Sequence, residues 1–130
     1  MNQKECPCGS GKTYENCCEI AHKNILNVIT AEALMRSRYS AFVLANMDYL
    51  KKSWHSSNKP SKNEIKEIVA WTQSVIWHKL EILSTSKGLK NDNEGYVEFK
   101  AYYYEGFILN NIHENSFFVK ENGHWVYQQV

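Results

Sequence analysis

The stretch TAEALMRSRYSAFVLANMDYL, residues 30 to 50, carries the clearest secondary-structure signal in the chain. Its apolar residues recur at spacings of three and four, which is the period of one helix face. These residues are Ala31, Leu34, Met35, Ala41, Phe42 and Ala45. Thr30 precedes the pattern and is a favourable N-cap residue. The pattern therefore predicts a helix that begins just after Thr30.

Beyond this helix the pattern stays helical and then changes to that of strands. Residues from Asn46 to about His55 predict a second, short helix, and Ser61 and Glu64 have the capping-box spacing that begins a third. From about Trp77 the apolar period falls to two, and turn residues divide the chain into four segments. The segments are WHKLEILSTS, GYVEFKAYYYEG, FILNNIHENSFFVKE and HWVYQQV. Three helices followed by an antiparallel four-stranded meander predict an α+β domain whose helices cover one face of a curved sheet.

Length and charge limit the classes of function. The 130 residues suit one ordinary domain with a small appendage. The net charge of +1, from 15 Lys and Arg against 14 Asp and Glu, gives no reason to expect broad binding to nucleic acid. No apolar run approaches the roughly 20 residues that span a bilayer, and the opening residues MNQKECPCGS lack the apolar core of a signal peptide. We expect a cytoplasmic protein without membrane insertion.

Upstream of the first helix, all four cysteines fall in CPCGSGKTYENCC, residues 6 to 18. The letters GSGKT match the end of a phosphate-binding loop, but Cys6 stands where that loop needs its first glycine. No strand fits into the five polar residues ahead of it. Two disulfides within so short a segment would be strained, above all between the neighbours Cys17 and Cys18. A metal site is the interpretation that these residues favour.

The spacing C-x-C, then eight residues, then C-C supplies four soft ligands on two short arms. The predicted ligands are Cys6, Cys8, Cys17 and Cys18. Four thiolates favour Zn²⁺, and iron competes because the same ligand set suits it. Four protein ligands leave no open position, so the metal would be structural and would fold this segment. His22 is the nearest substitute ligand, although an exposed histidine at a helix start is the simpler interpretation.

These features resemble a known bacterial family. CPCGSGKTYENCC resembles the SEC-C motif, the zinc-binding tail first known from the preprotein translocase motor SecA, with the four cysteines at its ligand positions. EALMRSRYSAFVLANMDYLKKSWH and HENSFFVKENGHWVY resemble the YchJ family, so the likeness covers nearly the whole chain. It implies a SEC-C motif at residues 1–22 and, at 23–130, a cone-shaped domain similar to nuclear transport factor 2 and to cystatins. It also implies a protein or ribosome-associated partner for the motif, but it does not supply a biochemical role.

Polar residues inside the predicted cone form a second candidate site. Arg38 falls within the apolar stripe of the first helix, where a guanidinium needs a partner. Alternation in the third strand puts Glu114 on the inward face, so we predict an Arg38–Glu114 ion pair or a water-bridged contact. Tyr39 and His55 could line the same cavity. A structural pair is the simpler interpretation, and the alternative is a small enzyme or ligand carrier that uses this cavity.

The segment AYYYEGF puts Tyr103 on one face of its strand and Tyr102 and Tyr104 on the other. Two outward tyrosines, with Trp77 or Trp125 alongside, could form a partner-binding or homodimer surface. An aromatic sheet face that is merely packed is the simpler interpretation.

Overall fold

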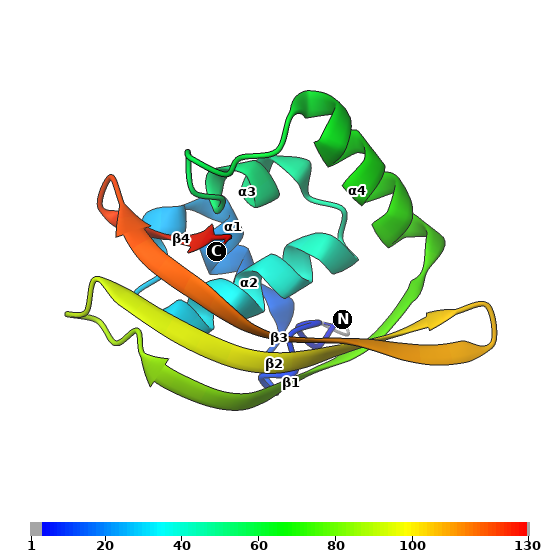
Figure 1. The fold of residues 1–130 in the computed structure, drawn as a ribbon. Helices are drawn as coiled ribbons and strands as arrows, with labels where there is room; N and C mark the ends of the chain where they lie inside the picture. Colours follow the sequence, from blue (N-terminus) through cyan, green and yellow to red (C-terminus); the bar gives the residue numbers. More distant parts are fainter. Residues whose placement is uncertain (1–3, 130) are drawn as a thin grey trace.

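The chain forms a helical layer on one face of a four-stranded antiparallel sheet, as Figure 1 shows for this computed structural model, which describes residues 4–129. The helices are α1 (Cys18–Lys23), α2 (Ala31–Val43), α3 (Met47–Lys52) and α4 (Lys62–Ser74), with 3₁₀ turns η1 (Tyr14–Asn16) and η2 (Ile25–Asn27). The strands are β1 (Ile76–Lys87), β2 (Glu94–Glu105), β3 (Ile108–Glu121) and β4 (His124–Gln128). The α+β prediction is confirmed.

Local capping signals define where the longer helices begin. The Thr30 side chain accepts a hydrogen bond from the Ala33 amide at 3.1 Å and starts α2. Ser61 and Glu64 form the reciprocal capping box of α4, with hydrogen bonds of 3.1 and 2.9 Å. Helix α1 was not predicted, because it is only six residues long and begins directly at a cysteine.

The second helix ends at Lys52, earlier than predicted, because the residues after it pair with the last strand. The Tyr127 amide donates to the Ser53 carbonyl at 2.7 Å, and the His55 amide donates to the Tyr127 carbonyl at 2.8 Å. This segment therefore extends along β4 as a short parallel bridge. The pairing ties α3 to the edge of the sheet.

The sheet order is β1-β2-β3-β4, with every neighbouring pair antiparallel. The β3–β4 turn uses Asn122 and Gly123, whose φ angles of 53° and 85° match the right-handed twist of the flanking strands. Register shifts interrupt β1 between Trp77 and Lys79, and between Ile82 and Ser84. Such bulges bend a strand, and here they curve the sheet around the helices.

The glycines Gly88 and Gly95 fix the position of α2 over the β1–β2 turn. The Ala31 amide donates to the Gly88 carbonyl at 2.9 Å. A Cβ atom on Gly88 would lie 2.6 Å from the Ala31 Cβ, and one on Gly95 would lie 2.4 Å from the Gly88 Cα. Neither distance is tolerated, so only glycine lets the helix and the two strands approach this closely.

One core joins the helices, the sheet and the cysteine segment. It contains Leu34 and Leu50 from the helices and Phe118 from the sheet, together with Cys8 and Cys18. Trp77 and Trp125 also face this side: Trp77 packs edge-on against Tyr39, and Trp125 is completely buried. The expectation that either tryptophan lies beside the outward tyrosines is wrong, because strand alternation turns both toward the helices.

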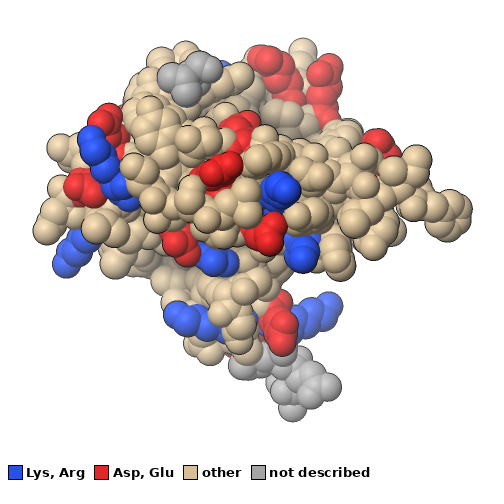
Figure 2. All heavy atoms as spheres, turned by 60° about the horizontal axis from the view of Figure 1, so that its bottom comes forward, with Lys and Arg blue, Asp and Glu red and all other residues tan. Residues whose placement is uncertain are grey.

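The outer face of the sheet carries charges of both signs, as Figure 2 shows. The Tyr102 hydroxyl donates to Glu81 at 3.1 Å, and the Lys79 Nζ lies 5.2 Å from the centre of the Tyr102 ring. His113 also points outward, where it contacts Glu98 at 2.7 Å. Within residues 4–129, no helix has both the length and the apolar character required to cross a bilayer.

Candidate metal centre and cavity

The four cysteines form a compact cluster. Their sulfur atoms all lie within 4.8 Å of one another, and the Sγ atoms of Cys8 and Cys17 are 3.6 Å apart. Tetrahedral zinc with bonds of about 2.3 Å places its sulfur ligands about 3.8 Å apart. The spacing of these thiols therefore fits a four-coordinate metal ion.

Two backbone turns bring the cysteines together. The Cys6 amide donates to the Lys12 carbonyl at 2.8 Å, and Glu5 pairs with Thr13, so the first arm folds back on itself. Gly9 has a φ of 79°, which a side chain would disfavour. The second arm is the turn η1, which ends at Asn16 and is followed by Cys17 and by Cys18, the first residue of α1.

Cys8 readily loses its proton, whereas Cys17 and Cys18 hold theirs. A hydrogen bond from Cys18 lowers the pKa of Cys8 to about 4. The same hydrogen bond and burial raise the pKa of Cys18, and burial raises the pKa of Cys17. Thiolates this close repel one another, so a bound cation would be needed to hold all four deprotonated, and metal binding would release protons. The donor set fits such a metal.

The cluster rests against α2. The Arg36 Nη1 donates to the Cys8 carbonyl at 2.8 Å, while its Nε pairs with Glu32 at 3.0 Å. The Cys6 sulfur contacts the Ser40 hydroxyl at 3.6 Å. Cys6, Cys8 and Cys18 are buried by these contacts, and Cys17 is half-buried.

His22 is neither a metal ligand in this arrangement nor an exposed residue. Its Nε2 donates to the Ser37 carbonyl at 2.8 Å, and its Nδ1 accepts from the Tyr14 hydroxyl at 2.7 Å. Its ring lies 4.6 Å from that of Tyr49. The expectation of an exposed histidine is wrong because α1 packs against α2. Burial is also the main cause that lowers the pKa of His22.

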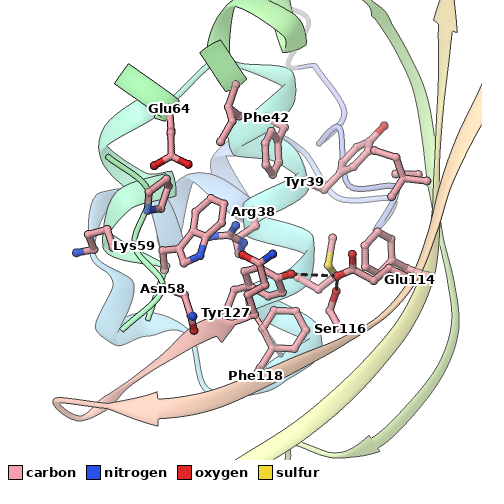
Figure 3. Close-up of a pocket in the computed structure, with 18 of the residues that line it drawn as sticks. Arg38, Tyr39, Phe42, Asn58, Lys59, Glu64, Glu114, Ser116, Phe118 and Tyr127 are labelled. Carbon is pink, nitrogen blue, oxygen red and sulfur yellow. Dashed lines mark hydrogen bonds between the residues drawn. The ribbon is translucent and has the colours of Figure 1, made fainter. Parts of the chain in front are cut away.

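A separate cavity of about 600 Å³ opens between α2, α4, the loop at residues 57–60 and the inward face of the sheet. Figure 3 shows Arg38, Tyr39 and Glu114 around it. Burial raises the pKa of Tyr39 to about 12. His55 does not line the cavity: its Nε2 lies 3.4 Å from Glu121, and its Nδ1 contacts Ser57. Pairing with β4 holds the backbone of His55 along the sheet edge.

Arg38 is only 4% exposed. Its Nη1 donates to the Ser53 hydroxyl at 2.7 Å and to the Leu50 carbonyl at 3.3 Å. The guanidinium carbon lies 4.7 Å from the ring centre of Trp54 and 4.9 Å from that of Tyr127. Burial lowers the pKa of Arg38 to about 10, so the side chain stays charged at neutral pH.

A direct Arg38–Glu114 ion pair is not formed. Within residues 4–129, no carboxylate oxygen lies within 4.0 Å of the Arg38 nitrogens. Instead Glu114 accepts hydrogen bonds from the Ser116 hydroxyl and, at 3.3 Å, from the Tyr127 hydroxyl. Tyr127 thus contacts both charges, and a water-bridged contact stays a prediction. Alternation along the last strand could have identified Tyr127, which pairs with the inward-facing Phe118.

Comparisons with known proteins agree with both parts of the chain. Residues 4–20 match the SEC-C motif, and residues 30–130 match the YchJ middle NTF2-like domain. A UPF0225 protein from Vibrio parahaemolyticus is 48% identical over 122 residues, covering 94% of this chain and 71% of the relative. One from Streptomyces coelicolor is 40% identical and covers 98% and 94%.

Two solved structures of SEC-C motif proteins share this fold. The solution structure of the protein from Rhodopseudomonas palustris has a TM-score of 0.79 and 32% identity, and the match covers 99% of this chain and 96% of that one. The crystal structure from Psychrobacter arcticus also gives a TM-score of 0.79, with 31% identity and coverage of 95% and 80%.

Proposed function

The chain belongs to the UPF0225 family and joins a SEC-C motif to a YchJ-type NTF2-like domain, and from this premise we propose that it is a cytoplasmic docking protein. In this proposal structural zinc, held by Cys6, Cys8, Cys17 and Cys18, shapes the motif that contacts a protein or ribosome-associated partner. The observation that carries the proposal is the closed set of four converging thiols. Four protein ligands leave no coordination position for substrate, which favours a structural role over a catalytic one.

The exposed side of the motif supports docking. Ser10, Lys12 and Asn16 are exposed, whereas three of the four cysteines face α2 and are buried. A groove of about 500 Å³ runs beside these residues, between the motif, α2 and the β1–β2 turn. A metal that locks the turns would hold these polar groups in one arrangement, which lowers the entropy lost on binding. Tyr14 supports this surface from behind through its hydrogen bond to His22.

Metal analysis is the first test. Purified protein is expected to contain about one zinc ion per chain, and the double variant Cys6→Ser, Cys8→Ser should contain none. One iron ion per chain, retained in place of zinc in protein from cells supplied with both metals, would overturn the choice of metal. It would leave the four-cysteine site in place.

Docking is tested by cross-linking capture from the native host and by co-sedimentation with ribosomes, with three variants beside the wild type. The double serine variant and Lys12→Glu should both lose the partner. Lys66→Glu makes the same charge change at an exposed position on α4 and should retain it. Equal capture by the wild type and both motif variants would refute a docking role.

A second candidate function is that of a ligand carrier. The observation that favours it is the open cavity, which Phe42, Phe99 and Phe118 line without filling. Its volume of about 600 Å³ lies in the range of about 300–1,000 Å³ that is typical of small-molecule sites.

A further inference from the structure

We propose that the cavity of the NTF2-like domain binds a small amphipathic monocarboxylate, with its acid group on Arg38 and its apolar body among the aromatic rings. This inference rests on the second candidate function and names its ligand class. It is independent of the docking role of the zinc motif.

The first support is the unbalanced charge of Arg38. Its hydrogen bonds within residues 4–129 both start from Nη1 and end on neutral oxygens, so Nε and Nη2 are not used. Arg36, on the same helix, contrasts with it, because its Nε pairs with Glu32 at 3.0 Å. A buried guanidinium that no carboxylate contacts directly is unfavourable, and its planar fork matches a carboxylate.

The second support is a neighbouring donor that also lacks an acceptor. The Nε1 of Trp54 is buried and has no hydrogen-bond partner within residues 4–129. The Trp54 ring lies 4.7 Å from the Arg38 guanidinium and lines the same cavity. An unpaired indole N–H beside a guanidinium with unused donors makes this wall of the cavity rich in donors, which favours a ligand group that accepts hydrogen bonds.

The other residues that line the cavity favour a ligand with an apolar body. They include Phe42, Ile68, Trp71 and Ile112, while polar groups of the loop at 57–60 stand at the edge (Figure 3). An aromatic or short aliphatic chain would replace water along these walls, which is favourable in proportion to the apolar area buried. The acid group would then lie deep in the cavity, on Arg38.

Glu114 disfavours a second negative charge inside the cavity. Its carboxylate faces the same cavity and is held there by the hydroxyls of Tyr127 and Ser116. A dicarboxylate would bring a second anion toward Glu114, and like charges in a site of low dielectric repel strongly. A monocarboxylate avoids this repulsion and is attracted to Arg38.

The test uses 3-phenylpropionate and its neutral amide as probes of equal shape, titrated into the full-length, metal-loaded protein by calorimetry. The acid should bind, and the amide should bind at least about 10-fold more weakly, because a neutral amide lacks the charge that strengthens a hydrogen bond to a guanidinium. In a ¹H–¹⁵N spectrum, the indole resonance of Trp54, assigned with Trp54→Phe, should shift with the acid.

Two variants separate the roles of the charges. Arg38→Met should weaken binding of the acid about 10-fold or more and leave the amide unchanged. Glu114→Gln should tighten binding of the acid, and it keeps the proposal testable if Arg38→Met does not fold. Glu98→Gln makes the same change on the outer face of the sheet and should have no effect.

The outcomes are distinct. Equal binding of acid and amide, or binding of the acid that neither Arg38→Met nor Glu114→Gln alters, would overturn the carboxylate assignment and keep the carrier function. No binding of either probe would overturn both. Loss of the partner by the motif variants has no bearing on either result.

Discussion

Replacing Cys17 with serine should destabilise the whole chain rather than release the first 22 residues alone. Cys17 is the most exposed of the four predicted ligands, so the smaller hydroxyl disturbs packing least while removing one metal bond. Without the metal, the turns that carry Cys6 and Cys8 would lose the bond that fixes them. Three of the four cysteine side chains belong to the core that α2 shares with the sheet. Loss of the metal therefore opens that core.

The magnitude follows from the contacts between the motif and α2. The Arg36 bond to the Cys8 carbonyl involves a charged donor and contributes about 1.5–3 kcal/mol. The His22 bond to the Ser37 carbonyl adds about 1 kcal/mol. Cys8 and Cys18 would also lose part of their buried apolar area. Together these losses should lower the free energy of unfolding by about 3–5 kcal/mol. For a domain of this length that corresponds to a fall of roughly 10–20 °C in Tm.

The assay is thermal unfolding followed both by far-ultraviolet circular dichroism and by tryptophan fluorescence, which reports the core. The two signals should fall together in Cys17→Ser and in wild type treated with a chelator. Ser10→Ala removes two exposed hydrogen bonds, one to the Cys17 sulfur and one from the Lys12 amide, and should lower Tm by a few degrees at most. A metal-free Cys17→Ser protein whose Tm stays within about 2 °C of wild type would refute the shared core and support two independent modules.

Three further changes test the fold and the site. Gly95→Ala should destabilise the protein by about 2–3 kcal/mol or more in urea unfolding, because its Cβ would overlap the Gly88 backbone; an unchanged urea midpoint would contradict that packing. Burial lowers the pKa of His22 below 6.5, so the unfolded chain gains a proton first as the pH falls. The free energy of unfolding should be constant above about pH 6.5 and should fall below that pH by at most about 1.4 kcal/mol per pH unit. In His22→Gln it should fall less steeply, and equal pH slopes in the two proteins would exclude His22 as the cause. Tyr127→Phe removes the bond to Glu114 and keeps the ring beside the guanidinium, so calorimetric unfolding should show a loss of only about 0.5–1.5 kcal/mol; a much larger loss would mean that the hydroxyl organises the cavity.

Short-range patterns made much of this fold predictable. The cap at Thr30 and the capping box at Ser61 depend on residues three positions apart, so the sequence alone reveals them. Strand alternation likewise predicts Glu114 on the inward face, where the structure has it. The cysteine cluster was predictable for the same reason, because all four cysteines lie close together in the sequence, on two short arms.

Features that depend on distant segments were not predictable. His55 faces away from the cavity because its backbone pairs with Tyr127, and no local pattern marks a bridge between such remote residues. The packing of the motif against α2 could not be predicted from the sequence. Arg36 donates to the backbone carbonyl of residue 8, and any residue at that position would supply the same acceptor. The division of the chain at residue 22 stays a prediction, which the Cys17→Ser experiment addresses.

Because β4 is the last element of the chain, the cysteine cluster is synthesised before the cavity beside Arg38 is complete. A growing polypeptide emerges from the ribosome with its N-terminal part first, so the cysteines are exposed to solvent before α2 exists to bury them. Metal capture can therefore precede folding of the domain. Tyr127, by contrast, is synthesised after every helix, and only its docking against residues 53–55 completes the wall beside Arg38. A nascent chain would hold its metal well before it could hold a ligand.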